Sequence, residues 1–566
     1  RLRGQGSGTL LLSRNPGSVI EMDNGSDVTL ENFAVLGAAG GSTTTAVVAA
    51  RNMLGLVVRN LVLVGVASGD ATSAALSVTG YLLGGRVEDS VLIAERGVVG
   101  LDGDEEALLL GHWGMTNNLV FASQRGISFG GNSFYFSGVR LRDNLVLGTS
   151  DRGIGVTGGA LLDCGVDVTG NTIYTSGDGI VCGASRVRIR GNDLLPMTQT
   201  GGNGIVVETG AEADRIEALS IMDNRVTGID GHGVVIRAPV GDGMIKQNRF
   251  ERLGGGGVVV EPSGSAGYLV IENNHFFDIG RVQEDTDRGY AGLDLVGVER
   301  ADVLNNVMVD IASGAVASPR IDAVLIAGSE HLRLGGNRIE GVGADRGAGL
   351  IAAIHVDTPV SQLQIDGNSI SRSSSQRQLT GDANWLAVLV DARPTDRAER
   401  TDVAGERVAA APDLRRAAPS VASRAVSETP TYAYVRLDNR VAFVTPHRVA
   451  VRDATPDSTL LRGNYLTAAV TSAPLVALAG IESCTLVEND CRSPGAGTGR
   501  NLSLLGIAMA DYVNLSNNRL VGAGDVDTFD IRSERFAATG NLSTGNIQVF
   551  GAPLPAPWDQ FNAIGG

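Results

Sequence analysis

An asparagine recurs along most of the chain, and each copy comes just before a short run of alternating apolar residues. Most gaps between successive copies span about 24 to 32 residues. The copies are Asn32, Asn60, Asn118, Asn144, Asn171, Asn192, Asn224, Asn248, Asn274, Asn306, Asn337, Asn368, Asn464, Asn489, Asn518 and Asn541. A fixed period of this length is the signature of a repeat architecture, so the repeating unit decides the fold.

A second mark has the same period and lies between the asparagines. It is a glycine followed by isoleucine or valine, and its successive steps are 29, 27, 26, 25, 29 and 24 residues. The glycines are Gly97, Gly126, Gly153, Gly179, Gly204, Gly233 and Gly257. Two independent marks with one period indicate one structural unit per repeat.

Each repeat alternates apolar and polar residues as a β-strand does. Two residues after the asparagine we expect buried side chains at Val62, Val120, Val146, Ile173, Val226, Phe250, Phe276, Met308, Ile339 and Ile370. Three residues before it we expect them at Leu141, Val168, Ile221, Ile245, Ile271, Val303, Leu334 and Ile365. Stacked coils would bury these positions, while the asparagine would occupy a left-handed turn and hydrogen-bond to its copies as a ladder.

The predicted fold is therefore all-β, a single right-handed parallel β-helix of roughly 15–18 coils with one long insertion. The composition agrees, because 77 glycines among 566 residues suit repeated bends and a hydrophobic content of 43% excludes a disordered chain. The period fails between about 373 and 445, and residues 393–428 lack alternation. We expect main coils over 1–372, interrupted coils with a flexible insertion at about 393–428 within 373–445, and C-terminal coils with a capping tail over 446–566. Within the interruption we expect coils to resume through 432–451.

The charge balance restricts the classes of partner that we expect the chain to bind. The chain has 46 basic and 62 acidic residues, a net charge of −16, without the basic stripe that a nucleic-acid site needs. No apolar run reaches the roughly 18 residues of a membrane-spanning helix. We expect neither a nucleic-acid partner nor a membrane span. The first residue is Arg1, so the sequence does not test for a signal peptide.

Several repeat units resemble those of a known superfamily. Residues 177–180 read Gly-Asp-Gly-Ile, residues 202–205 Gly-Asn-Gly-Ile and residues 231–234 Gly-His-Gly-Val, and the opening residues 3–9 are similar to a first coil. The chain resembles right-handed parallel β-helix proteins of the pectate-lyase-like superfamily. That superfamily includes lyases, hydrolases, epimerases, phage tailspikes and non-catalytic adhesins.

The resemblance leaves two function classes open. One is a secreted or surface-associated protein that binds, and in the enzymatic case cleaves, polysaccharide as a polysaccharide lyase or glycoside hydrolase. The other is a non-catalytic spike, adhesin or scaffold of a phage-like or surface assembly. Whether the chain is an enzyme stays open on the sequence, as does assembly into a homo-oligomer or larger complex.

The residues that precede the recurrent glycine form a column, one per coil. They are Arg96, Arg125, Arg152, Asp178, Asn203, His232 and Gly256. We predict an active site there, with Asp178 or His232 as acid or base and Arg152 neutralising a substrate carboxylate. Asn203 and Arg125 would contact substrate. The alternative is a solvated turn column that tolerates polar residues. His232 lies in a Gly-His-Gly that resembles inverting polygalacturonases, but Asp178 is 54 residues away and no paired carboxylates accompany it.

Other candidates lie outside this column. Trp113 and Tyr290 could stack on sugar rings, with core packing as the alternative, and Trp385 is similar. Two acidic loops, 102–106 and 284–287, have oxygen ligands that would suit Ca²⁺ but match no calcium motif, so we expect no cofactor and no metal. Cys182 and Cys491 fall on inward columns and are interpreted as packing thiols, while bridges Cys164–Cys182 and Cys484–Cys491 stay open.

The last candidate is a partner surface. The outward positions after the recurrent glycine are Gly155, Val181, Val206, Val235 and Val259. A row of valines suggests a covered face, with the 393–428 insertion or another protomer as the cover. β-Propensity alone is the alternative explanation.

Overall fold

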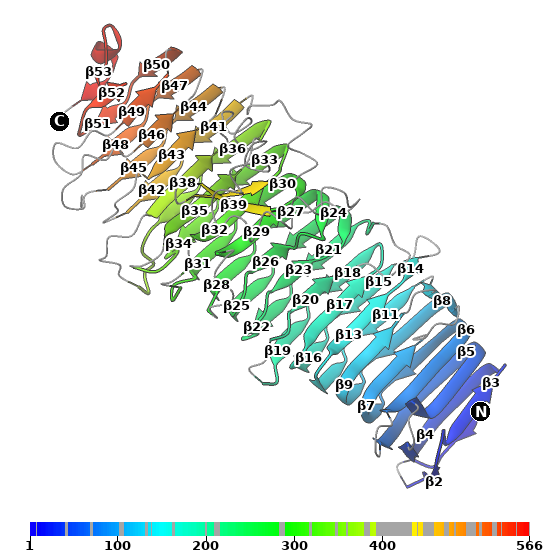
Figure 1. Cartoon of the computed structure of the whole chain (residues 1–566). Helices are drawn as coiled ribbons and strands as arrows, with labels where there is room; N and C mark the ends of the chain where they lie inside the picture. The colour runs from blue at the N-terminus through cyan, green and yellow to red at the C-terminus, as the bar shows by residue number, and fades with distance from the viewer. Residues whose placement is uncertain are drawn as a thin grey trace. The chain divides into compact units, whose positions relative to one another are not determined.

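The computed structural model describes residues 1–391, 433–437, 440–444 and 458–566, with further gaps inside these ranges (Figure 1). The gaps are 7, 40–43, 68–71, 101–106, 131–133, 137, 161–164, 199–200, 209–214, 282–288, 316–317, 319, 346–348, 358–359, 378–384, 469–474, 480, 482, 494–504, 509–511, 523–528, 534, 551 and 565–566. The chain divides into two compact units, Arg1–Arg249 (unit 1) and Phe250–Gly566 (unit 2). The predicted boundaries at 372/373 and 445/446 stay predictions.

Both units are parallel β-solenoids, so the predicted fold class is confirmed. Each coil contributes three strands, named here by their place relative to the turn that holds the recurrent asparagine. The pre-turn strand comes before that turn, the post-turn strand after it, and the glycine-led strand follows at the recurrent glycine. Each strand pairs in parallel with its counterpart in the next coil, as Val166↔Val187 and Ile154↔Ile180 show.

Unit 1 begins with long strands that run through a turn and end with short ones. The first strands are β1 (Leu2–Arg3), β2 (Leu10–Pro16), β3 (Ile20–Asp23), β4 (Ser26–Ala39), β5 (Thr44–Ala67), β6 (Thr72–Glu88), β7 (Val91–Gly100), β8 (Ala107–Thr116), β9 (Leu119–Phe129), β10 (Phe134–Phe136) and β14 (Gly159–Ala160). Pre-turn strands follow as β11 (Val139–Arg142), β15 (Val166–Thr169), β18 (Val187–Arg190), β21 (Leu219–Met222) and β24 (Pro239–Lys246). Post-turn strands are β12 (Leu145–Thr149), β16 (Thr172–Thr175), β19 (Asp193–Pro196) and β22 (Arg225–Thr227), and glycine-led strands are β13 (Arg152–Thr157), β17 (Asp178–Gly183), β20 (Ile205–Val207) and β23 (Val234–Ile236).

Unit 2 repeats the same three strands. Its pre-turn strands are β27 (Ser265–Glu272), β30 (Val298–Leu304), β33 (His331–Gly335), β36 (Gln362–Asp366), β41 (Ser458–Arg462), β44 (Ser483–Val487), β47 (Tyr512–Ser516) and β50 (Arg535–Thr539). Its post-turn strands are β25 (Arg249–Leu253, whose first residue ends unit 1), β28 (His275–Ile279), β31 (Val307–Ile311), β34 (Arg338–Glu340), β37 (Ser369–Ser371), β42 (Tyr465–Thr467), β45 (Asp490–Arg492), β48 (Arg519–Val521), β51 (Leu542–Ser543) and β54 (Ala563–Ile564). Its glycine-led strands are β26 (Val258–Val260), β29 (Tyr290–Val296), β32 (Arg320–Ala327), β35 (Leu350–Asp357), β38 (Trp385–Asp391), β43 (Val476–Ala479), β46 (Leu505–Ala508), β49 (Phe529–Arg532) and β52 (Ile547–Val549).

The region predicted to resume coils between 432 and 451 does not do so. It contains β39 (Ala433–Leu437) and β40 (Arg440–Val444), which pair antiparallel in a two-stranded sheet of their own. The solenoid instead passes from β36 to β41 and from β38 to β43, with Gln362↔Ser458 and Val388↔Val476 in register. In β39 and β40 the alternation belongs to antiparallel strands, which have the same two-residue period as the strands of a coil. Residues 393–428 lie outside the described residues.

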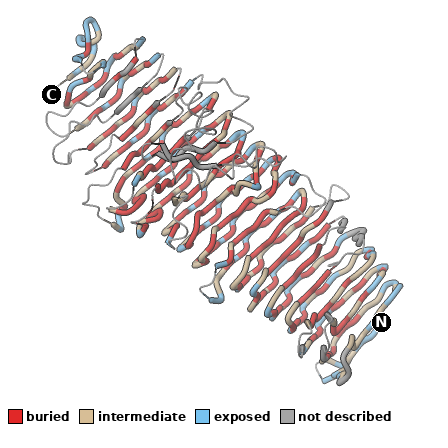
Figure 2. Tube along the Cα trace, in the orientation of Figure 1, coloured by how far each residue is buried: buried red, intermediate tan, exposed pale blue. Residues whose placement is uncertain are grey.

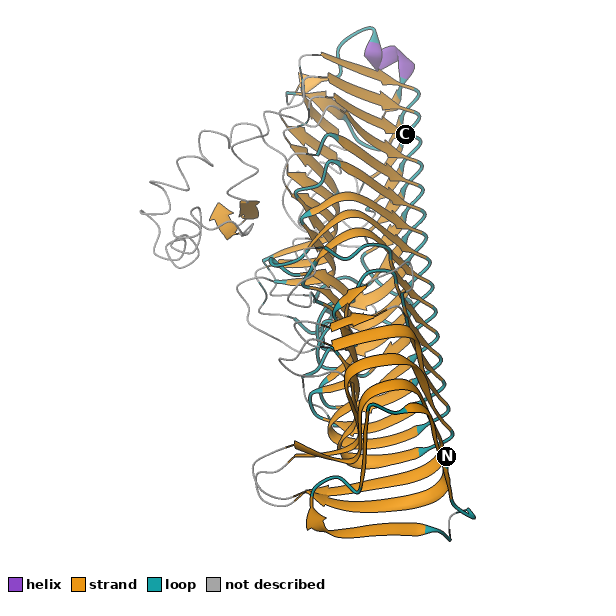
Figure 3. Ribbon diagram, turned by 90° about the vertical axis from the view of Figure 1, so that its right-hand side faces the viewer, coloured by secondary structure: helices purple, strands orange, loops and turns teal. Residues whose placement is uncertain are grey.

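Helix is nearly absent from the described chain. A short 3₁₀ turn, η2 (Trp558–Phe561), follows β53 (Ala552–Pro553) in the proline-rich tail (Figure 3). Within the part of the chain that the structure describes, no helix has the length and apolar character to span a membrane.

Buried residues recur in strand after strand (Figure 2), and most of them are apolar residues at the predicted positions. The predicted inward residues after the asparagine, from Val120 to Ile370, and those before it are all buried, and each such valine, isoleucine or leucine contributes about 1.5–3 kcal/mol of transfer free energy. Val62 is the exception, since Leu61 and Leu63 on either side of it are the buried residues. Val62 pairs with Val91, which also faces outward.

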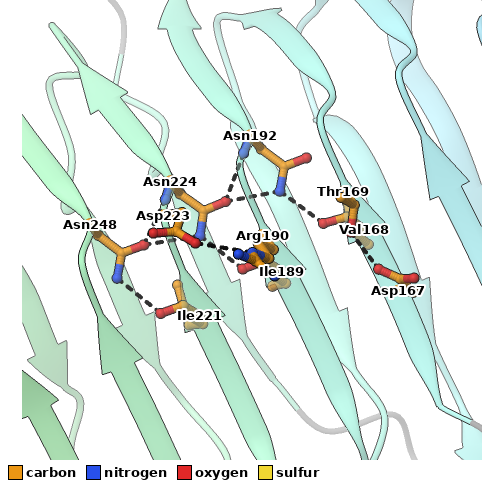
Figure 4. Close-up of polar contacts among 10 residues, drawn as sticks. All are labelled: Asp167, Val168, Thr169, Ile189, Arg190, Asn192, Ile221, Asp223, Asn224 and Asn248. Atoms are coloured by element: carbon orange, nitrogen blue, oxygen red, sulfur yellow. Dashed lines mark hydrogen bonds and ion pairs between the residues drawn. The ribbon is translucent and has the colours of Figure 1, made fainter.

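The asparagines form the predicted ladder, drawn around Asn224 in Figure 4. Asn224 Nδ2 donates to Ile189 O at 2.9 Å and to Asn248 Oδ1 at 3.0 Å. Asn224 Oδ1 accepts from Asn192 N at 3.0 Å and from Asn192 Nδ2 at 2.9 Å. Every polar atom of the buried amide thus has a partner in its own or an adjacent coil, which is the condition for burying it. Unit 2 repeats the pattern, for example from Asn306 to Asn337 at 2.9 and 3.0 Å.

The left-handed residue of the turn is the one before the asparagine. Its φ is +53° at Asp143, +70° at Gly170 and +55° at Asp223. The expectation that the ladder asparagine itself is left-handed is therefore wrong. Asn32 and Asn60 are left-handed, at +61° and +53°, because they stand one position earlier in the turn and pair with each other at the surface. This one-residue difference also explains why Val62 faces outward.

Candidate functional site

The predicted column in unit 1 does bring its polar residues together. Arg125, Arg152 and Asp178 lie in register on β9, β13 and β17. Asp178 Oδ1 accepts from Asn203 N at 2.8 Å and from Asn203 Nδ2 at 3.0 Å. Asn203 Oδ1 in turn accepts from the backbone N–H of His232 at 3.0 Å. The Asp178 carboxylate and the Asn203 amide each accept a backbone N–H of the next coil. Together they form a second, shorter ladder of hydrogen bonds between coils.

The two arginines of the column share a carboxylate. Asp151 Oδ2 lies 2.5 Å from Arg125 Nε, and Asp151 Oδ1 lies 3.5 Å from Arg152 Nε. Burial acts to raise the pKa of Asp151, but the Arg125 hydrogen bond and the charge of Arg152 outweigh it, so this pKa lies below its usual range. Each guanidinium is therefore already engaged by an anion of the chain. The roles predicted for Arg125 and Arg152 toward a substrate stay predictions.

The predicted stacking residues differ in exposure. Trp113 is fully buried, with its ring centroid 5.5 Å from that of Phe129, and Trp385 is also fully buried. Neither indole reaches the surface to meet a sugar, so the core-packing alternative holds for both. Tyr290 begins β29 in unit 2 and is half-buried.

The valine row is covered within the chain. Val181, Val206 and Val235 have exposed fractions of 2%, 0% and 0%. The predicted coverage is confirmed for these three valines, whose burial requires no second protomer, whereas Val259 is half-buried. The insertion named as one cover lies outside the described residues.

A buried ionic cluster in unit 2 escaped sequence reasoning. Asp322 on β32 has its Oδ2 2.8 Å from Arg320 Nε, and its Oδ1 is 3.2 Å from His355 Nδ1 on β35. The side chains of these three residues have exposed fractions of 0–3%. Burying charges is costly unless they are paired, so Arg320 and His355 are what allows Asp322 to sit there.

Asp322 occupies the column position that precedes the recurrent glycine, but its coil lacks that glycine. Asp322 pairs with Ala291 and Ala352, and the residue after it is Ala323, where the repeat of unit 1 has glycine. A search for the recurrent glycine therefore ends before β32. Asp294 on β29 and His355 share the neighbouring outward row, since both pair with Leu325. The half-buried Tyr290 and Asp294 thus lie one strand away from Asp322.

Metals and thiols add no further site among the described residues. No group of three or more histidine, cysteine, aspartate or glutamate side chains in that part of the chain could hold a metal ion, and both acidic loops, 102–106 and 284–287, lie outside it. Cys182, Cys484 and Cys491 are free and buried, which confirms the packing role of Cys182 and Cys491 and excludes a Cys484–Cys491 bridge. Burial raises the pKa of Cys182 to about 12, that of Cys491 to about 12, and that of Cys484 further. Cys164 lies outside the described residues.

A comparison with protein families agrees with the fold. Residues 160–308, about a quarter of the chain, match the family model for a right-handed β-helix region. The chain is also similar to a solved structure, the A-module of mannuronan C-5 epimerase AlgE6 of Azotobacter vinelandii. That match has 15% identity and a TM-score of 0.29, and covers 68% of this chain and 91% of the other. No curated protein matches. The predicted resemblance to right-handed parallel β-helix proteins is confirmed at the level of fold.

Proposed function

We propose that the chain is a polysaccharide-binding β-helix protein whose ligand meets the half-buried Tyr290 and Asp294 of β29, with the buried Asp322–His355 pair of β32 and β35 behind them as the acid–base group. The observation that carries the proposal is the contact of 3.2 Å between Asp322 Oδ1 and His355 Nδ1. A carboxylate held on one ring nitrogen fixes the orientation and tautomer of an imidazole, which leaves Nε2 for proton transfer to a ligand.

The neighbouring groups support this assignment. Arg320 pairs with Asp322 and offsets its charge, while Tyr290 and Asp294 present a ring and a carboxylate at the half-buried edge of the same face. Burial of the dyad excludes water, which strengthens its electrostatic interactions. Outward rows repeat about every 4.8 Å along the stack, a spacing that suits a linear ligand with repeating polar groups.

The dyad favours a lyase over a glycoside hydrolase. Glycoside hydrolysis ordinarily uses two carboxyl groups about 5–9.5 Å apart, on the two sides of the scissile bond. Here Asp322 is committed to Arg320 and His355, so Asp294 lacks a second free carboxylate from Asp322 and the imidazole of His355 is the group suited to proton transfer. Removal of a proton next to a sugar carboxylate needs one such base.

A non-catalytic scaffold is the second candidate. It is favoured by the contacts of Asp178 and Asn203, because these polar residues of unit 1 already hydrogen-bond to the next coil. Secretion or surface attachment is a prediction that either function would suit.

The test pairs a binding screen with a turnover assay. The wild-type chain is screened on acidic and neutral polysaccharides, and cleavage is followed by new reducing ends and by absorbance of unsaturated sugars. His355→Ala should retain binding and lose at least about 100-fold in turnover. His275→Ala, which removes an exposed histidine of β28, is the matched control and should change neither. Neither binding nor turnover by the wild type would favour the scaffold, and equal turnover of wild type and His355→Ala would remove His355 from the mechanism.

A further inference from the structure

The outer face of the post-turn strands in unit 1 carries two adjacent rows of apolar side chains. The row nearer the turn is Leu10, Ala34, Val62, Val91, Leu119 and Leu145, each in register with the next. The second row, two residues further along each strand, is Leu12, Leu36, Val64, Ile93, Phe121, Leu147 and Tyr174. These two rows are called the apolar face.

The apolar face is open to solvent. Leu12, Ile93, Phe121 and Tyr174 have exposed fractions of 52%, 37%, 41% and 36%, and the residues between them are half-buried. Coils repeat about every 4.8 Å and the rows are about 7 Å apart, so the face covers roughly 400–500 Å². This is the range in which an exposed apolar patch marks an interaction site.

The same two rows are mixed in unit 2, where charged and polar residues stand among apolar ones such as Val307, Val309 and Tyr465. The row nearer the turn there contains His275, Arg338, Ser369, Asp490 and Arg519, and the second row contains Glu340, Ser371, Thr467 and Arg492. The repeat therefore tolerates charge at these positions. β-Propensity alone does not explain why seven successive strands of unit 1 carry none.

We propose that the apolar face of unit 1 packs against the apolar face of a second copy of the chain. Parallel sheets are normally covered on both faces, and two sheets pack about 10 Å apart. A stable dimer needs roughly 600–1,000 Å² from each partner. The apolar face supplies the centre of such an interface, and the polar turns beside it, with Asp89 and Asp143 on one side and Asp151 on the other, supply its rim.

The two rows fit each other across a two-fold axis parallel to the stack of coils. Such an axis places the row nearer the turn of one copy opposite the second row of the other. Because this axis preserves position along the stack, residues of the same coil face each other: Ala34 opposes Leu36, Val91 opposes Ile93, and Leu119 opposes Phe121. Apolar side chains thus meet apolar side chains, and no charge is buried, because the facing rows contain none up to Leu145 and Leu147. The first row ends at Thr172 and Asp193, which marks the limit of the interface.

Light scattering coupled to size exclusion tests the proposal on the full chain. The wild type should have twice the monomer mass and dissociate on dilution. The double variant Ile93→Lys, Phe121→Lys brings four ammonium groups to the centre of the interface and should raise the dissociation constant at least about 100-fold. Its circular dichroism and urea midpoint should match those of a wild-type monomer, since both side chains point away from the core.

The matched control places lysines on the same rows of unit 2. Val309→Lys with Thr467→Lys alters half-buried outward residues of β31 and β42 and should leave the dimer intact. A wild type that is monomeric at every concentration overturns the proposal, and so does a dimer that survives Ile93→Lys, Phe121→Lys. Flotation of a monomeric wild type with phosphatidylcholine vesicles would assign the face to lipid and would also overturn it.

Discussion

Unit 1 contains two polar columns that run along the same coils and differ in how deeply they are buried. The asparagine ladder at the turn is buried, and each amide bonds to the coils on both sides of it, as at Asn192 and Asn224. The column at the glycine-led strands is half-buried and changes residue type from coil to coil, through Asp178, Asn203 and His232. Both columns use side-chain oxygen atoms to accept backbone N–H groups of a neighbouring coil.

The difference shows how burial fixes residue identity. A buried position accepts only a side chain that satisfies every donor and acceptor it meets, which selects asparagine again and again. A half-buried position can complete its hydrogen bonds with water, so Asp, Asn, His or Arg all serve. Variety in the second column is thus expected of a structural column and does not by itself indicate catalysis.

The largest effect is expected from breaking the buried ladder. Asn224→Ala removes the acceptor of Asn192 N and of one Nδ2–H of Asn192, whose other Nδ2–H keeps Val168 O, and it removes the side-chain donor to Ile189 O. At about 1–3 kcal/mol for each orphaned group, the free energy of unfolding should fall by about 4–6 kcal/mol, measured by urea denaturation. Asn514→Ala, which removes a half-buried outward amide of β47, is the control and should cost less than about 1 kcal/mol. Similar midpoints for the two variants would contradict the assigned role of the ladder.

Asp322→Ala should have the next largest effect, because it leaves the buried side chains of Arg320 and His355 without their carboxylate partner. Removing one member of a buried ion pair costs about 3–5 kcal/mol, since the other charge stays buried without compensation. The loss would appear in the urea midpoint of the chain. Asp302→Ala on β30 is the control, since the bond of 2.6 Å that Asp302 accepts from Tyr268 is exposed and should contribute little. A loss below about 1 kcal/mol for Asp322→Ala would mean that water reaches Arg320 and His355.

A smaller effect is expected at the half-buried column. Asn203→Ala removes the amide that bonds to Asp178 and to the backbone of His232, but water can replace both contacts. The cost should be about 1–2 kcal/mol, well below that of Asn224→Ala. The urea midpoints of the two variants compare the columns directly. An equal loss at Asn203 and Asn224 would show that exposure does not separate them.

Most of the fold could be predicted from the sequence, because the repeat sets the buried positions many times over. The inward residues from Val120 to Ile370 follow from alternation alone. Val62 does not, since its turn carries the asparagine one position early and only the backbone conformation of Asn60 reveals the shift. The hairpin β39–β40 was mistaken for a coil because strand alternation is the same in parallel and antiparallel pairs.

The site was harder to predict, for two physical reasons. Asp322 and His355 of the Arg320–Asp322–His355 cluster are 33 positions apart, and Ala323 replaces the recurrent glycine beside Asp322. No local sequence pattern therefore predicts the cluster. Trp113 was a candidate for sugar stacking because a sequence does not show which face of a long strand such as β8 is covered. A wide search that accepted alanine at the marker position would have found Asp322.

The smallest effect concerns the ion pair at the foot of the half-buried column. The pKa of Asp151 lies below its usual value of 3.8 in the folded chain, because Arg125 and Arg152 outweigh the effect of burial. A depressed carboxyl pKa contributes stability above the unfolded value, and that contribution is lost as the pH falls through the folded one. Asp151→Asn should therefore remove part of the stability that the wild type loses below about pH 4. Arg125→Ala should make that loss smaller and complete it at higher pH, while its onset, set by the unfolded pKa, stays in place. Because Asp151 is about two-fifths exposed, solvent screening keeps the change within about 1 kcal/mol. Urea midpoints measured in half-unit pH steps would resolve it, with Arg190→Ala as the control, since the Arg190–Asp223 pair is more exposed. Identical pH profiles for the wild type and Asp151→Asn would show that the two arginines bind this carboxylate no better in the folded chain than water does in the unfolded one.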